Sequence, residues 1–160
     1  MIIAGTGHRP DKLGGYGEDV MERLVHVAAV WLADNTKHGD RVITGMALGW
    51  DIALARACVE LNIPYICAIP FVGQQRMWPK ESQAWYIELL STAYQIEHIC
   101  DPGYAPWKMQ KRNEWMVDRA DMVLALYNGT SGGTGNCLKY VQEKNKKIVN
   151  LWEKYEKLKA

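Results

Sequence analysis

The residues best suited to chemistry lie in three glycine-rich turns. The longest turn reads Asn128-Gly-Thr-Ser-Gly-Gly-Thr-Gly-Asn-Cys137 and separates the apolar run 122–127 from a helix-like segment. A strand that ends in glycines and reopens as a helix leaves backbone N–H groups bare, and such groups suit a phosphate. Ordering so many glycines costs chain entropy, which a bound ligand would explain. This turn therefore predicts a nucleotide-like ligand, and the alternative is a mobile loop that binds nothing.

The first turn, Gly5-Thr-Gly-His-Arg-Pro10, offers both a hydroxyl and a cation. Its small residues let the backbone approach a ligand, and Arg9 carries a planar fork that matches phosphate or carboxylate. The alternative is an ordinary strand-ending turn in which Arg9 pairs with a carboxylate. His8 is interpreted as a hydrogen-bonding turn residue rather than a general base.

The second turn, Gly45-Met-Ala-Leu-Gly49-Trp-Asp51, places a carboxylate at the start of a helix. Asp51 could cap the helix, bind a ribose hydroxyl or, as a weaker third hypothesis, take part in catalysis. Trp50 could stack on a base or cover the core.

A polar residue also interrupts an apolar helical stripe. Asn113 lies four residues after Met109 on the face that continues to Met116. Its amide needs partners, either within the protein or in a ligand crevice. The neighbouring Lys111 and Arg112 are expected to be solvated, and the alternative is that either one closes over a phosphate.

These patterns predict one ligand-binding crevice without a metal and without a resident cofactor. The ligand-binding residues predicted for it are Gly5, Thr6, Gly7, His8, Arg9, Gly45, Met46, Ala47, Gly49, Asp51, Asn113, Asn128, Gly132, Gly133, Thr134, Gly135 and Asn136. Asp51 is the weak candidate for a catalytic group.

Length and composition bound the class of protein. A chain of 160 residues, 48% of them apolar, is the size of one domain with a real core. A net charge of +1 gives no overall basic field for nucleic acid. The four cysteines match neither a zinc spacing nor a disulfide framework, so buried thiols are expected. With no signal peptide or membrane span recognised, a cytoplasmic protein is predicted.

Strands and helices are expected to alternate along the chain, which favours a parallel sheet covered on both faces. In such a sheet the glycine turns gather at the carboxyl ends of the strands. The expected strands are 1–4, 41–44, 65–69, 94–99, 122–127 and 147–151. The expected helices are 17–36, 51–61, 81–93, 108–119 and 135–143. Residues 1–152 are expected to form the domain, and 153–160 a charged, exposed helical tail.

Several separated motifs, in order along residues 1–151, resemble the SLOG superfamily, and within it the YpsA/YoqJ-like branch of short stand-alone proteins from bacteria, phages and prophages. The motifs that carry the resemblance are Gly5-Thr-Gly-His-Arg-Pro10, Thr44-Gly-Met-Ala-Leu-Gly-Trp-Asp51, Pro70-Phe71 with Gln74 and Trp78, Gln110-Lys-Arg-Asn113, Arg119-Ala-Asp121 and Ser131-Gly-Gly-Thr-Gly135.

The resemblance implies a single-domain, Rossmann-like, three-layer α/β/α fold with a mostly parallel sheet. It also implies a nucleotide or nucleotide-derived ligand on the glycine turns, and a homodimer is compatible with it. In the phosphoribohydrolase branch a catalytic glutamate follows the last turn. Here Lys139 occupies the aligned position, which makes that activity doubtful.

Three functions follow as hypotheses. The first is capture of a nucleotide or nucleotide-derived signal, in a phage setting a defence signal. The second is an enzyme acting on an N-glycosidic or phosphate bond, with Asp51 as its carboxylate. The third, single-stranded DNA binding, draws on Trp50, Trp78, Trp107 and the cluster Lys108, Lys111 and Arg112, and the near-neutral charge counts against it.

Overall fold

Strands and helices alternate along the whole chain, as the apolar periodicity predicts. The computed structural model describes residues 1–159. The strands are β1 (Ile2–Gly7), β2 (Arg41–Thr44), β3 (Tyr65–Ile69), β4 (Gln95–His98), β5 (Met122–Leu126) and β6 (Lys147–Asn150). The α-helices are α1 (Glu18–Asn35), α2 (Trp50–Leu61), α3 (Lys80–Ser91), α4 (Pro106–Arg119), α5 (Gly133–Glu143) and α6 (Trp152–Lys159).

The six strands form one sheet in the order β4-β3-β2-β1-β5-β6, and every pair of neighbours in it is parallel. In the central pair, Ile3 of β1 lies opposite Met122 of β5, and Gly7 lies opposite Leu126. Residues 3–6 and 122–126 are buried, as expected for strands covered on both faces. The predicted, mostly parallel sheet is therefore confirmed as wholly parallel across the described residues.

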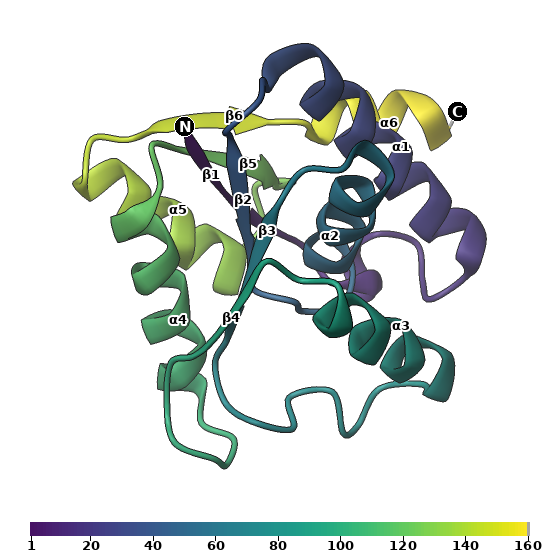
Figure 1. Cartoon of the computed structure of the whole chain (residues 1–160). Helices are drawn as coiled ribbons and strands as arrows, with labels where there is room; N and C mark the ends of the chain where they lie inside the picture. The colour runs from purple at the N-terminus through teal and green to yellow at the C-terminus, as the bar shows by residue number, and fades with distance from the viewer. Residues whose placement is uncertain (160) are drawn as a thin grey trace.

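Helices cover both faces of the sheet and make three layers (Figure 1). On one face α1, α2, α3 and α6 enclose a core that includes Ile3, Leu54 and Tyr86. On the other face α4 and α5 enclose a smaller core that includes Ala4 and Met116. Because adjacent strand residues such as Ile3 and Ala4 point to opposite faces, each strand contributes to both cores.

Several element boundaries differ from the prediction, and two of these differences lie in the glycine turns. β1 is three residues longer than 1–4, because residues 5–7 continue the pairing with Leu124, Ala125 and Leu126 of β5. α5 begins at Gly133, two residues early, after Gly132 turns the chain with a φ of 143°. Both differences enlarge the part of each turn that has fixed geometry.

The C-terminal segment is helical as predicted, but it is wrong to describe it as wholly exposed. Tyr155 of α6 is fully buried, and its hydroxyl donates a hydrogen bond of 2.7 Å to the Leu13 carbonyl oxygen. α6 also packs on α1. This helix therefore covers the loop that leaves β1.

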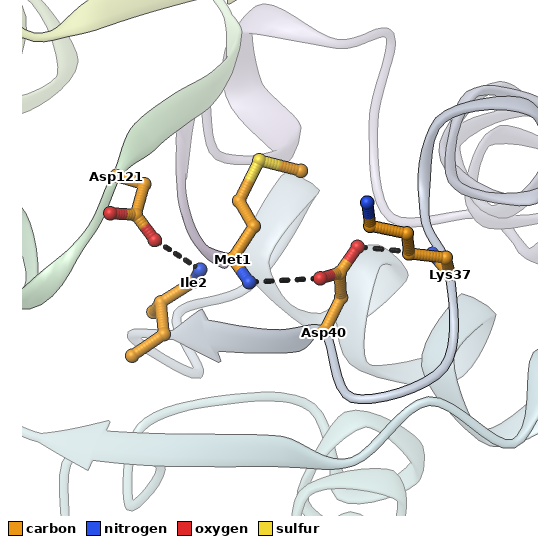
Figure 2. Close-up of polar contacts among 5 residues, drawn as sticks. All are labelled: Met1, Ile2, Lys37, Asp40 and Asp121. Atoms are coloured by element: carbon orange, nitrogen blue, oxygen red, sulfur yellow. Dashed lines mark hydrogen bonds and ion pairs between the residues drawn. The ribbon is translucent and has the colours of Figure 1, made fainter.

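Two carboxylates fasten the edge of the sheet at which the strands begin (Figure 2). Asp40 accepts hydrogen bonds from the Met1 amine, at 2.9 Å, and from the Lys37 backbone N–H, at 3.0 Å. Asp121 accepts one of 2.7 Å from the Ile2 backbone N–H. The bond from the amine, followed by that from Lys37, holds the pKa of Asp40 below its usual value. The start of β1 is thus tied to the residues that precede β2 and β5.

Candidate functional site

A cavity of about 270 Å³ lies at the carboxyl ends of β2, β1 and β5. Successive strands extend the sheet in one direction from β1 to β4 and in the other from β5 to β6, so the cavity lies where the strand order reverses. Its lining residues are Thr6, Gly7, His8, Arg9, Asp11, Lys12, Ala47, Asp51, Met109, Arg112, Asn113, Gly132, Gly133 and Thr134.

The structure brings together side chains and glycines from all three predicted turns and from α4. The predicted residues that line the cavity are Thr6, Gly7, His8, Arg9, Ala47, Asp51, Asn113, Gly132, Gly133 and Thr134. The predicted residues outside its lining are Gly5, Gly45, Met46, Gly49, Asn128, Gly135 and Asn136.

Several glycines outside the lining are required by packing. A side chain at Gly5 would collide with Leu54 of α2, and one at Gly49 would collide with the His8 carbonyl oxygen. Gly49 also has a φ of 91°, which disfavours other residues. These glycines let α2 approach the sheet closely and position the turn indirectly.

Asn128 lies outside the cavity lining and contacts His8, which lines it. His8 Nε2 lies 2.8 Å from Asn128 Oδ1 and 2.9 Å from the Asn128 backbone N. The same Oδ1 accepts hydrogen bonds from the backbone N–H and the hydroxyl of Thr130. Burial lowers the pKa of His8, which favours the neutral ring at pH 7. His8 and Asn128 therefore join the first and third turns.

The first turn of α5 presents N–H groups that no side chain caps. The first intrahelical bond runs from the Asn136 N–H to the Gly132 carbonyl oxygen, so the N–H groups of residues 133–135 lack an acceptor within the helix. A side-chain carbon built on Gly133 would meet no atom within 4 Å. The helix thus begins in open space at the cavity, with the positive end of its dipole toward it.

Two cations flank this helix start, and sequence analysis identified only Arg9. Arg9 is exposed, and among residues 1–159 it takes part in no ion pair, contrary to the alternative in which a carboxylate holds it. Lys12 was missed, although it follows Arg9 in the same turn. Its Nζ donates hydrogen bonds of 2.9 Å to Thr130 Oγ1 and 2.7 Å to the Ser131 carbonyl oxygen. Lys12 therefore fastens the glycine turn across the cavity.

The prediction that Arg112 is solvated is wrong. Its guanidinium is buried, and Nη1 donates hydrogen bonds to the carbonyl oxygens of Gly45, at 2.6 Å, and Ala68, at 3.4 Å. Nε donates a hydrogen bond of 2.9 Å to Asn113 Oδ1. The Asn113 oxygen is therefore satisfied internally while the residue still lines the cavity. A buried cation with fixed partners holds α4 against the carboxyl ends of β2 and β3.

Asp51 is a buried carboxylate at the cavity. Its Oδ2 accepts a hydrogen bond of 3.3 Å from the Ala47 backbone N–H, and 6% of the residue is exposed. Burial raises the pKa of Asp51 to about 6, against the lowering effects of Arg112, the Ala47 N–H and Arg9. The group is thus able to accept a hydrogen bond or exchange a proton near neutral pH.

We expect the stability of the fold to depend on pH through the titration of the Asp51 carboxyl group. An acid whose pKa is higher in the folded than in the unfolded state stabilises the fold below its ordinary pKa of 3.8, and that contribution is lost as pH rises through about 6. Relative to Asp51→Asn, the wild type should therefore lose free energy of unfolding, on the order of 3 kcal/mol, between pH 4 and 7. Urea unfolding of both proteins measures the difference, and parallel pH profiles would contradict it.

The proposed aromatic and cationic cluster is only partly at the surface, because Trp107 is exposed and Trp78 is half-buried while other members are buried. Trp50 is fully buried, and its Nε1 donates a hydrogen bond of 3.3 Å to the Leu124 carbonyl oxygen. Lys108 is buried too, with Nζ bonded to the carbonyl oxygens of residues 101–103. Of the cations in that cluster, Lys111 alone is exposed. Base stacking on Trp50 is therefore excluded.

Lys139 lies on the exposed side of α5 and does not line the cavity. Among the described residues, no cluster of three or more His, Cys, Asp or Glu side chains could hold a metal ion. Over the same residues, no helix combines the length and the apolar character needed to cross a membrane.

A wholly parallel sheet, covered by helices on both faces and with a polar crevice where the strand order reverses, defines a Rossmann-like α/β protein. The family model described as the YspA SLOG family, YpsA, matches residues 3–156. The chain therefore belongs to the SLOG family.

Relatives by sequence agree with this assignment. The chain is 38% identical over 139 residues to the "Uncharacterized SPbeta prophage-derived protein YoqJ" of Bacillus subtilis (strain 168), covering 76% of this chain and 80% of that protein. It is 24% identical over 157 residues to a "UPF0398 protein" of Bacillus cereus, covering 91% of this chain and 83% of the relative.

Solved structures share the fold. DNA processing protein A from Helicobacter pylori, described for its single-stranded DNA binding mode, superposes with a TM-score of 0.67 at 18% identity, covering 94% of this chain and 64% of that one. The Streptococcus pneumoniae protein gives 0.63 at 16% identity, covering 92% of this chain. This chain spans about half of the latter, at 49%. The protein TM1055 gives 0.61 at 12% identity, with coverages of 92% and 71%.

Proposed function

We propose that this protein binds a nucleotide or nucleotide-derived ligand in the cavity at the carboxyl ends of β1, β2 and β5. The observation that carries the proposal is the start of α5, whose uncapped N–H groups open into the cavity that Arg9 and Lys12 also line. Backbone donors, a helix dipole and two cations together favour a phosphate over a neutral group. In this proposal the phosphate contacts residues 132–134.

The opposite wall of the cavity suits a sugar. Asp51 offers a buried acceptor, and within residues 1–159 the Asn113 Nδ2 group donates to no protein acceptor. A ribose supplies hydroxyl groups that donate to the carboxylate and accept from the amide. Binding in the cytoplasm, where nucleotides are abundant, fits this ligand. One relative is named as prophage-derived, and for a phage setting we propose sensing or sequestration of a signalling nucleotide in phage–host conflict.

Native mass spectrometry tests the proposal directly. The purified protein is incubated with mono-, di- and cyclic nucleotides and NAD-derived compounds, and bound mass and free products are followed together. Retention of an intact ligand supports capture. Product in molar excess over protein would make the chain an enzyme, with Asp51 as the first carboxylate to replace, because it lines the cavity and Lys139 supplies no carboxylate there. No bound mass from any member of the panel would contradict the proposal.

Loss of Arg9 is expected to weaken binding of AMP by about 1.5 to 3 kcal/mol, which is roughly a 10- to 100-fold increase in Kd. The variant Arg9→Ala removes a charge-assisted hydrogen bond without disturbing a protein partner, because Arg9 is exposed and takes part in no ion pair among residues 1–159. Calorimetric titration measures the change. Arg119→Ala, an exposed arginine at the far end of α4, serves as the control and should leave Kd unchanged.

Single-stranded DNA binding draws on the fold shared with the Helicobacter pylori protein. The burial of Trp50, Lys108 and Arg112 leaves it with less support than nucleotide binding. A steep fall of oligonucleotide affinity with salt concentration would favour it.

A further inference from the structure

A second cavity of about 330 Å³ lies further along the same edge of the sheet. It is formed by the segment 71–77, which follows β3, and the loop 102–104, which follows β4. Both segments lie beyond the carboxyl ends of their strands (Figure 1). Since β3 is next to β2 in the sheet, this cavity neighbours the one that contains Ala47 and Asp51.

The walls of the second cavity are mainly aromatic and apolar, with Gln74 and Arg76 as their polar side chains. Phe71 is buried and packs edge-to-face against Tyr104, with ring centroids 6.0 Å apart and an interplanar angle of 79°. Tyr104 is 72% exposed, and Met77 is 94% exposed. Large apolar side chains left in water around one hollow mark a binding surface, and an aromatic ring or a thioether packs well on a flat ring.

One wall is already rigid. Lys108 Nζ donates hydrogen bonds to the carbonyl oxygens of Asp101, Pro102 and Gly103, at 2.8, 3.2 and 2.7 Å. A buried cation with three carbonyl partners holds this loop, and with it the backbone before Tyr104. Binding of a ligand here therefore costs less conformational entropy, because the loop is already ordered.

A residue in the wall of the second cavity, Gln74, carries an unsatisfied polar atom. Gln74 Nε2 donates a hydrogen bond of 3.2 Å to the Gly45 carbonyl oxygen. Because a carbonyl oxygen only accepts, this contact fixes which end of the amide is nitrogen. The remaining atom, Gln74 Oε1, is buried and accepts no hydrogen bond within the described residues. An N–H or O–H group of a ligand would satisfy this oxygen.

One carbonyl oxygen is hydrogen-bonded to a residue from the lining of each cavity. The Gly45 oxygen accepts from Gln74 Nε2 on the side of the second cavity and from Arg112 Nη1 on the side of the first. We infer that the second cavity binds the heterocyclic base of the nucleotide whose phosphate lies on residues 132–134, with Tyr104 stacking on the ring and Gln74 accepting from a base amino group. This inference rests on the proposed function.

Calorimetry with three phosphate compounds tests the inference. AMP carries phosphate, ribose and an amino-bearing base, purine riboside 5′-monophosphate lacks the amino group, and ribose 5-phosphate lacks the base. We expect AMP to bind the wild type at least tenfold more tightly than ribose 5-phosphate, with the purine compound between them. Tyr104→Ala should bring the Kd of AMP close to that of ribose 5-phosphate and leave the latter unchanged. Gln74→Leu should remove only the advantage of AMP over the purine compound.

The exposed Tyr16 lies outside the second cavity and provides a matched control in Tyr16→Ala, which should alter none of the three Kd values. Equal binding of AMP and ribose 5-phosphate to the wild type would overturn the base site and leave the phosphate site standing. So would an equal loss for both ligands in Tyr104→Ala. Failure of all three compounds to bind would refute the base site, and if the nucleotide panel also gave no bound mass, the proposed function would fail with it.

Discussion

Replacing Gly133 with aspartate is expected to abolish nucleotide binding while the fold remains as stable as that of the wild type. A Cβ atom at this position meets no atom within 4 Å, so the site has room for a side chain to begin without a clash. A carboxylate in the first turn of α5 also interacts favourably with the helix dipole. In the cavity, however, the same charge occupies the place proposed for the phosphate and repels it. The expected loss is at least 100-fold in Kd, about 2.7 kcal/mol.

A matched variant separates the effect of the added charge on binding from the effect of the added side-chain volume. Gly133→Asn introduces a side chain of nearly the same size without the charge, and it should weaken binding much less than Gly133→Asp. Calorimetric titration with AMP measures both, and thermal unfolding without ligand checks that the midpoint is not lowered. If the two variants bound AMP with the same Kd as the wild type, the phosphate would lie elsewhere and α5 would be excluded from the site.

Removing the Arg112 side chain should have the largest effect on stability, a loss of about 3 to 5 kcal/mol in the free energy of unfolding. The guanidinium is buried and binds the carbonyl oxygens of Gly45 and Ala68 and the Asn113 amide. Arg112→Ala removes a buried donor from each of these acceptors, of which the Gly45 oxygen keeps only Gln74 Nε2, and it opens a cavity beside the site. It also removes the cation that opposes the rise in the pKa of Asp51.

The neighbouring lysine supplies the control. Lys111 is exposed on the same helix, and Lys111→Ala should change the free energy of unfolding by no more than about 0.5 kcal/mol. Urea unfolding at pH 7, followed by tryptophan fluorescence, measures both variants. An Arg112→Ala protein as stable as Lys111→Ala would mean that the buried hydrogen bonds of the guanidinium contribute no net stability.

Most of the fold can be predicted from the local pattern of apolar and polar residues along the chain. Apolar runs such as 65–69 and 122–126 are too continuous for exposed strands, and the helical spacing between them requires crossover connections that make the strands parallel. Parallel strands bring all their carboxyl ends to one edge. For this reason the meeting of the turns around Thr6, Ala47 and Gly133 follows from the sequence, without knowledge of any contact.

Local patterns were less informative about the roles of individual glycines. Gly5 and Gly133 look alike in sequence, since each lies in a glycine-rich turn after a strand. In the structure, Gly5 faces Leu54 of α2 and is required for packing, whereas Gly133 faces open space. The difference depends on which helix packs over each turn, and that is determined by the position of α2 on the sheet.

Local residue patterns were enough to predict the alternation of strands and helices, the edge of the sheet at which polar groups gather, and the glycine turn at the start of α5. Tertiary structure alone decided which cations are buried and which face the cavity. Arg112 finds its carbonyl partners 67 and 44 residues away, and Lys12 binds Thr130 at a separation of 118 residues. The physical reason is that burial of a charge depends on acceptors brought from distant segments, and helical periodicity reports only which residues share a face.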